Sequence, residues 1–286
     1  MTNTHQWARE AAHIADTSLS HTRRGKSRNT NAPLKFAVLD LEFVYDRLAH
    51  QQYAINDEQS PDKIRWPFCR IVAAAWLPIA FDPQHPAAPI VGELINIGRP
   101  EVGEAEIVKS LFAYLEEHPD TAIVTWGGGY KDLAVLSRAA AEYDLCLPKQ
   151  VRQGWAPEQV HLDLSDAVKG KAIPMHLPEY AASLAIPAKT GLSSKAIGFA
   201  AEAGEWDVVC PRAAEDVCTT AILLGRYLAS NRLVAASGLA CDLAITKSII
   251  ATHGHLPFVA DHIVKWREGR QAKLTAAATV DIADEE

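Results

Sequence analysis

The stretch Phe36-Ala37-Val38-Leu39-Asp40-Leu41-Glu42 combines an apolar segment with two acids at its end. The nearly continuous apolar run from Leu34 to Leu41 is typical of a central strand that is buried on both faces of a sheet. In an extended strand, residues two apart point to the same face, so the carboxylates of Asp40 and Glu42 project together. Two neighbouring anions repel each other unless they are hydrated, as at a strand end that enters solvent, or bound by a metal cation.

The elements around this stretch predict an α/β fold. Strands are expected at 69–77, 90–97 and 121–126, with a short apolar segment at 160–162. The strands 34–41, 69–77 and 90–97 follow one another with short connections, which suggests an antiparallel meander. Helical spacing covers 104–117, 132–143, 178–184, 213–228, 232–252 and 257–270, whereas the polar residues 46–66 predict a loop. This order resembles that of the ribonuclease H-like fold, and it predicts a mixed five-stranded sheet flanked by helices.

Composition is compatible with a packed enzyme. The 286 residues are 48% hydrophobic with a net charge of −7, which argues against a protein that coats nucleic acid electrostatically. The five cysteines form no C-x-x-C pair and predict reduced thiols. No apolar run approaches roughly 18 residues and the N-terminus lacks a secretory signal, so a cytoplasmic protein is expected.

The chain divides by composition into four parts. Residues 1–32 predict a flexible arm, whose basic patch around Arg24 either is solvated or contacts phosphates. Residues 33–230 form the predicted main domain, residues 231–275 a helical extension packed on it, and residues 276–286 an acidic tail.

Two further acids stand at the starts of predicted helices. Asp132 follows a strand and the turn Gly127-Gly128-Gly129-Tyr130-Lys131, and Asp216 lies near the first turn of the helix over 213–228. Each alone is explained as an acid facing a helix dipole. Together with Asp40 and Glu42, they are expected to meet in one cleft, where carboxylates suit two hard cations, Mg²⁺ or Mn²⁺.

These residues resemble three motifs of the DEDD superfamily of 3′–5′ exonucleases, in particular the predicted exonucleases related to the proofreading domain of family-B DNA polymerases. The first motif is similar to 36–42, the second to 123–133 and the third to 206–220, with His161–Leu164 and Leu184–Lys189 resembling the linking segments. The likeness covers roughly residues 34–230. It implies that Asp40, Glu42, Asp132 and Asp216 are metal ligands and catalytic residues, and that a 3′-terminal phosphodiester is hydrolysed to release nucleoside monophosphates.

The chain departs from this pattern at two places. The superfamily usually carries a Tyr four residues, or a His five residues, before the last Asp, where this chain has Arg212 and Pro211. Neither of these can act as a general base. Gly127 also replaces the usual Asn. Three explanations compete: the metals alone acidify water, a residue from elsewhere substitutes, or the site binds a 3′ end without cutting it. The candidate substitutes are His161, His176 and Tyr180.

Several side chains are candidates for substrate contacts. Arg212 is suited to neutralise a phosphate but equally fits a surface cation near a helix start. Lys189 and Lys195 are candidate phosphate contacts, although solvated lysines explain them more simply. Trp126 and Tyr130 are candidates for stacking on a terminal base, with burial in the core as the alternative for Trp126. Leu41, between the first two acids, completes the candidate substrate contacts.

The sequence therefore predicts a metal-dependent 3′–5′ exonuclease acting on single-stranded ends, with DNA favoured over RNA by the resemblance. The alternative is a module of the same fold that binds a 3′ end without efficient catalysis. A third hypothesis is a protein-interaction role for the helices after Asn231, through which the chain would form a homo-oligomer.

Overall fold

The computed structural model describes residues 32–56, 63–152, 160–189 and 194–272. Residues 1–31 of the predicted N-terminal arm and the whole acidic tail lie outside this range, and so does the side chain of Lys195. Among the described residues, no helix combines the length and the apolar character required to cross a membrane.

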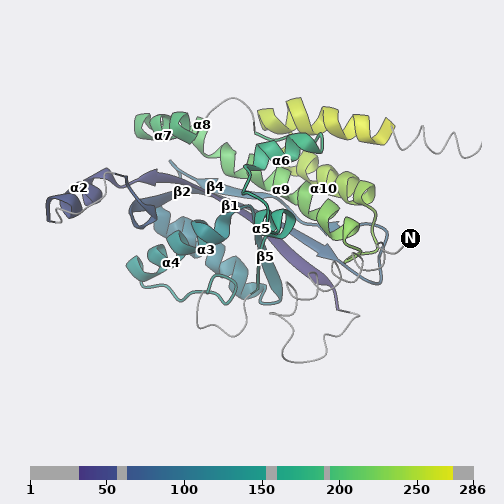
Figure 1. Ribbon diagram of the computed structural model, residues 1–286, viewed down its shortest axis with the longest axis horizontal. Coiled ribbons are helices and arrows are strands. Elements are labelled where there is room, and N and C mark those ends of the chain that lie inside the picture. Colours follow the sequence, from purple (N-terminus) through teal and green to yellow (C-terminus); the bar gives the residue numbers. More distant parts are fainter. Residues whose placement is uncertain (1–31, 57–62, 153–159, 190–193, 273–286) are drawn as a thin grey trace, which may run out of the picture.

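A six-stranded mixed sheet forms the centre of the molecule (Figure 1). Its strands run in the order β3-β2-β1-β5-β6, with β4 also paired to β2. β1 is antiparallel to β2 and parallel to β5, and β5 is parallel to β6. These directions confirm the ribonuclease H-like fold class. The strands are β1 (Leu34–Tyr45), β2 (Cys69–Phe81), β3 (Ile90–Val91), β4 (Ile95–Gly98), β5 (Thr121–Thr125) and β6 (His161–Asp163).

The prediction of one strand over 90–97 was wrong, which is why the sheet has six strands and not five. The residues between β3 and β4 leave the ladder opposite Pro78 of β2, which has no N–H to donate. Gly92 instead donates its N–H to the Pro78 carbonyl over 2.9 Å. Leu94 then turns its side chain into the core, where it is 1% exposed.

Helices cover both faces of the sheet. α3 (Glu104–Glu117) and α4 (Asp132–Glu142) pack on one face, against Leu39 and Leu41 of β1. α9 (Pro211–Ser230) and α10 (Gly238–His253) pack on the other, against Val38. Since side chains alternate along a strand, Asp40 and Glu42 share the face of Val38 and lie beneath α9. This alternation places the two acids next to the helix that carries the third motif.

Most predicted helices form near their expected positions. α6 spans Leu177–Ser183, and the last helical stretch, residues 257–272, contains the π-helical segment η3 (Val259–Ile263). The helix predicted from residue 232 begins only at Gly238, because Ser237 caps it by accepting the Ala240 N–H over 3.1 Å. α5 (Leu164–Lys169), α7 (Ser194–Ala203) and α8 (Trp206–Val209) had no sequence prediction.

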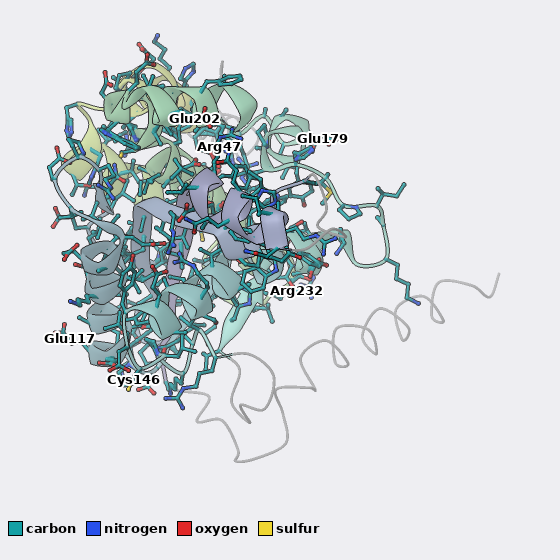
Figure 2. The ribbon with its side chains drawn as sticks, turned by 90° about the vertical axis from the view of Figure 1, so that its left-hand side faces the viewer. Arg47, Glu117, Cys146, Glu179, Glu202 and Arg232 are labelled. Carbon is teal, nitrogen blue, oxygen red and sulfur yellow. The ribbon has the colours of Figure 1, made fainter. Side chains whose placement is uncertain are left out.

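The stretch 46–66, expected to be an excursion with a loop, contains a helix that was not predicted, α2 (Arg47–Asn56). No residue of α2 is buried, so its sequence has no apolar face from which to predict a helix. Arg47 of α2 forms an ion pair with Glu202 of α7 at 2.5 Å, and the two side chains lie side by side in Figure 2. α2 is therefore held by this ion pair and by ring contacts of His50 and Tyr53 with Phe68.

The segment after Asn231 shares the main hydrophobic core. Cys241, Ile245 and Ile249 of α10 are fully buried against α9, and Val259 and Ile263 of η3 join the same cluster. Deleting residues 231–286 would therefore uncover the α9 face. The domain boundaries and the homo-oligomer stay predictions.

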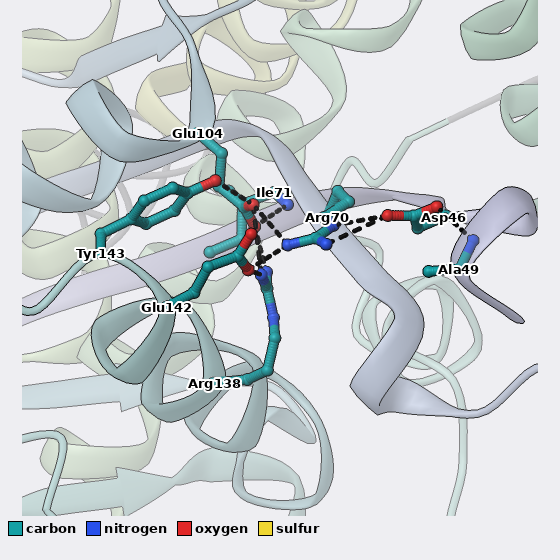
Figure 3. Close-up of polar contacts among 8 residues, drawn as sticks. All are labelled: Asp46, Ala49, Arg70, Ile71, Glu104, Arg138, Glu142 and Tyr143. Atoms are coloured by element: carbon teal, nitrogen blue, oxygen red, sulfur yellow. Dashed lines mark hydrogen bonds and ion pairs between the residues drawn. The ribbon is translucent and has the colours of Figure 1, made fainter. Parts of the chain in front are cut away.

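A network of charged side chains fastens the end of β1 to α3 and α4 (Figure 3). Its centre is the buried Glu104, which pairs with Arg138 of α4 and accepts a hydrogen bond from the Tyr143 hydroxyl at 2.9 Å. Arg70 of β2 lies 3.6 Å from Glu104 and 3.0 Å from Asp46, the residue that follows β1. The network fixes the strand end that carries Asp40 and Glu42.

Candidate metal centre

Asp40, Glu42 and Asp216 form a compact group of carboxylates. Each offers an oxygen, and these oxygens all lie within 4.8 Å of one another. The first two come from β1 and the third from the start of α9, which crosses above that strand (Figure 1). In the neighbouring strand β2, Ala75 lies opposite Asp40 and Ala73 lies opposite Glu42. These small side chains leave space around the two carboxylates on the face that α9 covers.

The carboxylates resist ionisation in this environment. Burial raises the pKa of Asp40 well above its usual range, and the nearby Asp216 and Glu42 raise it further. Burial likewise raises the pKa of Glu42 to about 7 and that of Asp216 above its usual range. Anionic oxygens held this close lack sufficient compensating charge, and a divalent cation would supply it.

One atom of the group supports the interpretation as a cation site. Oδ1 of Asp216 is buried and, among the described residues, has no hydrogen-bond partner. A buried carboxylate oxygen without a partner carries the full cost of losing its hydration. A metal bound between the three carboxylates would satisfy this oxygen, so the donor set suits the hard cations Mg²⁺ and Mn²⁺.

Lys189 lies in the carboxylate group, so the interpretation of this residue as a solvated lysine was wrong. Its Nζ forms an ion pair with Oδ2 of Asp216. Burial alone would lower the pKa of Lys189, but Asp216, Asp40 and Glu42 together raise it, so the side chain stays charged. The backbone just before it is held by Thr219 of α9, whose hydroxyl donates to the Pro187 carbonyl over 2.9 Å.

Arg212 is buried at the start of α9, with 6% of its surface exposed, so the surface-cation interpretation was wrong. Its Nη1 donates to Oε2 of Glu215 over 2.8 Å. Its positive charge also opposes the rise in the pKa of Glu42 and of Asp216. The position at which the superfamily usually has a tyrosine therefore holds a cation next to the carboxylates.

Asp132 lies near the group but outside it. It is buried at the start of α4, and burial raises its pKa to about 7, with Asp163 and Asp216 adding to the rise. Its charge also raises the pKa of Asp40, which places the two acids within electrostatic reach. The structure therefore brings together three of the four predicted ligands and holds the fourth nearby.

Asp163 shapes the glycine turn that leads to Asp132. Its Oδ1 accepts the N–H of Gly127 at 2.9 Å, and its Oδ2 accepts that of Gly129 at 3.0 Å. Gly127 adopts the left-handed region with φ 74°. The same carboxylate caps α5 by accepting the Ser165 N–H at 3.1 Å. Sequence reasoning missed this role, although an Asp at the end of a strand just before a helix is the usual capping signal.

The other candidate residues fall in different places. Trp126 packs against the core, and its ring lies 5.3 Å from that of Tyr180, which favours the core interpretation. Tyr130 is 70% exposed, and its hydroxyl donates to Asp166 over 3.2 Å. The side chain of Leu41 is buried on the opposite face of the sheet, so only its backbone is left for a substrate contact.

His161 does not join the carboxylate group. Its Nε2 lies 2.8 Å from Oγ1 of Thr125, within the parallel pair of β5 and β6. Burial lowers its pKa. A neutral imidazole engaged with a threonine is not placed to act on a water held by Asp40 and Asp216.

One family model matches most of the chain. It is described as a predicted 3′–5′ exonuclease related to the exonuclease domain of PolB, and it matches residues 62–268. The matched span includes Asp132, Lys189 and Asp216, and it begins after β1 with its two acids. No curated protein matches the chain.

Solved structures with a similar chain path are distant in sequence. The family B DNA polymerase from the hyperthermophilic archaeon Pyrobaculum calidifontis is 13% identical with a TM-score of 0.46, over 78% of this chain and 30% of that chain. E. coli Exonuclease I in complex with a 5cy-dA13 oligonucleotide is 14% identical with a TM-score of 0.36, over 68% and 43%. The zinc-ion-bound form of the E. coli ExoI–ssDNA complex is 14% identical with a TM-score of 0.35, over 76% and 45%. The chain spans less than half of each of these proteins.

Proposed function

Because the chain belongs to the family of predicted 3′–5′ exonucleases related to the exonuclease domain of PolB, we propose that it removes nucleotides from the 3′ ends of single-stranded nucleic acid in a divalent-metal-dependent reaction. DNA is the favoured substrate. The observation that carries the proposal is the group formed by Asp40, Glu42 and Asp216, whose oxygens approach within 4.8 Å. Such a group is costly to keep in a protein unless it binds cations.

The four acids divide into two roles in this proposal. Asp40, Glu42 and Asp216 would hold one Mg²⁺ or Mn²⁺ ion, and Asp132 with Asp40 would help to hold a second. Two such ions supply an acidified water and stabilise the leaving 3′ oxygen. Asp163 keeps the turn before Asp132 in place, so that this carboxylate remains beside the other three.

Lys189 and Arg212 offset part of the negative charge of these acids. Lys189 pairs with Asp216, and the charge of Arg212 favours the ionised forms of Glu42 and Asp216. Both cations stand where a phosphate approaching the carboxylates would need charge compensation. Because each keeps its proton, neither replaces the missing tyrosine as a base.

The second candidate is a module that binds a 3′ end without cutting it. It is favoured by one observation, which is that the positions usually held by Tyr or His carry Arg212 and Pro211. Binding of an oligonucleotide without release of mononucleotides at any metal concentration would support it. Robust metal-dependent degradation would eliminate it.

The test is release of mononucleotides from a single-stranded oligonucleotide labelled at its 3′ end, with Mn²⁺ or Mg²⁺ present. The wild-type protein is expected to release label at once, whereas Asp40→Ala and Asp40→Asn lose the activity. Asp261→Ala is the matched control, because Asp261 is an exposed acid in the last helical stretch. Equal cleavage by wild type and by both Asp40 variants would refute the site assignment. A 5′ label, a duplex and an RNA strand measure direction and substrate class.

A further inference from the structure

A second charged site lies at the far end of α9 from the carboxylates. An open hollow in the surface, with a volume of about 550 Å³ and called the arginine cavity below, lies there between the end of α9 and the start of α10, and its lining includes Arg226, Arg232 and Arg270. Of the described residues, none that lines it is acidic. From Asp216 to Ser230 the helix rises about 20 Å, so this arginine cavity is separate from the metal centre.

Two of the three arginines are fixed by a buried acid. Asp242 of α10 is fully buried, and Arg226 donates to its two carboxylate oxygens from Nε at 3.1 Å and from Nη2 at 2.9 Å. Arg270 donates to the same carboxylate from Nε at 3.0 Å and pairs through Nη2 at 2.9 Å. Both guanidiniums lie over the ring of Trp266, at 5.4 and 5.8 Å. Side chains held in this way lose little conformational freedom when a ligand arrives.

The lining of the arginine cavity carries excess positive charge. Asp242 is paired with two of its three guanidiniums, those of Arg226 and Arg270, so one carboxylate stands against three positive charges. Arg226 also donates Nη1 to the Leu184 carbonyl over 3.3 Å, so its donors are engaged. In the described part of the chain, Nη1 of Arg270 meets no acceptor. The exposed Arg232 adds a whole guanidinium at the rim.

The rim is built by a turn with a constrained backbone. Arg232 adopts φ 55°, in the left-handed region that non-glycine residues rarely occupy. Its N–H donates to the Ala229 carbonyl at 3.0 Å, and the next N–H donates to the Leu228 carbonyl at 2.9 Å. The turn therefore holds the Cα of Arg232 beside the first residues of α10, whose N-terminus also favours an anion.

We propose that the arginine cavity binds the phosphate group of a nucleotide. The guanidiniums of Arg232 and Arg270 recognise the phosphate oxygens, while Val234, Ala236 and Leu239 offer an apolar wall to the sugar or base. The phosphate comes either from the backbone of a nucleic-acid strand or from a free mononucleotide. The link to a nucleic-acid strand rests on the proposed function, whereas the phosphate chemistry rests on the cavity alone.

The experiment is calorimetric titration of the full chain in EDTA, with deoxythymidine 5′-monophosphate and with a single-stranded oligothymidylate as separate probes. Arg232→Glu is expected to weaken binding by about tenfold or more, because it reverses a charge that touches the phosphate. Arg270→Gln keeps a donor for Asp242 and removes the cation, so it is expected to weaken binding with the fold intact. Lys247→Ala, which removes an exposed cation of α10 outside the cavity, is the matched control and binds as the wild type does.

The outcomes distinguish a nucleic-acid strand from a free nucleotide as the source of the phosphate, and they test the phosphate site separately from the proposed exonuclease function. Tighter binding of the oligonucleotide identifies a strand as the ligand, and equal or tighter binding of the monophosphate identifies a free nucleotide. Absence of saturable binding of both probes overturns the proposal, and so does an Arg232→Glu affinity equal to that of Lys247→Ala. Since EDTA removes the metals and no bond is cut, failure of the exonuclease proposal leaves this result unaffected.

Discussion

Replacing Glu42 by glutamine is expected to stabilise the metal-free protein at pH 8. Burial raises the pKa of Glu42 to about 7 in the folded protein, from 4.5 for an unperturbed glutamate. At about 1.4 kcal/mol for each pH unit, this difference destabilises the folded, ionised form by about 3 kcal/mol. Because the folded protein binds the proton more tightly, its stability falls as pH rises from 4.5 to about 7. Glutamine does not ionise and escapes this loss.

The assay is urea unfolding in EDTA at pH 5 and at pH 8. Glu42→Gln is expected to exceed the wild type by up to about 3 kcal/mol at pH 8 and by much less at pH 5. The control is Glu117→Gln, an exposed glutamate at the end of α3 that is visible in Figure 2. Saturating Mn²⁺ should reverse the order, because only the carboxylate binds the metal well. An equal stability of Glu42→Gln and wild type at pH 8, or an advantage that is the same at both pH values, would refute the reasoning.

Three further substitutions test other parts of the site. Asp163→Asn turns one acceptor of the glycine turn into a donor, so the free energy of unfolding is expected to fall by about 1–3 kcal/mol and Mn²⁺ binding, measured by calorimetry, to weaken. Asp166→Asn leaves the acceptor of the turn intact and should change neither quantity. Equal results for both variants would contradict the assigned role. Lys189→Met removes the cation paired with Asp216, so the free energy of unfolding in EDTA at pH 8 should fall by roughly 3 kcal/mol. This loss should shrink at pH 5, where the carboxylates take up protons. A loss that is the same at both pH values would count against the charge-compensating role of Lys189. Leu41→Ala should cost about 2–5 kcal/mol as a core truncation while Mn²⁺ affinity stays unchanged, and a large fall in that affinity would place Leu41 in the site after all.

The sequence predicts those helices and strands in which the pattern of apolar and polar residues shows which side chains are buried. β1 is apolar up to its two acids, and α3 shows an apolar stripe from Glu104 to Glu117, so both appear where expected. The split of the strand over 90–97 depends on Pro78 in the neighbouring strand, and residues 90–97 themselves do not show that they pair there. α2 buries none of its residues, so periodicity gives no signal for it.

The same division holds for the candidate site. Asp40 and Glu42 are recognisable because a strand of period two places them on one face. Asp216 has Glu215 beside it in the same helix, so only the resemblance to the third motif singles it out. Lys189 joins them from a segment without regular structure, through a contact that only the packing of α9 creates. The carboxylates of the site can therefore be found from the sequence, whereas the cation that compensates their charge is found only from the three-dimensional packing.

The three successive glycines before Asp132 differ in the replacements they allow. A Cβ at position 128 would lie 2.6 Å from Oδ2 of Asp132 and 2.7 Å from Thr125, so any side chain there displaces the acid. At Gly127, in contrast, a Cβ meets nothing within 4 Å, and the left-handed backbone is one that asparagine adopts more readily than most residues. The cost of an asparagine at this position therefore lies in the left-handed backbone and not in a clash of its Cβ. A side chain at position 127 thus has to adopt a left-handed backbone, whereas a side chain at position 128 has to push Asp132 or Thr125 aside.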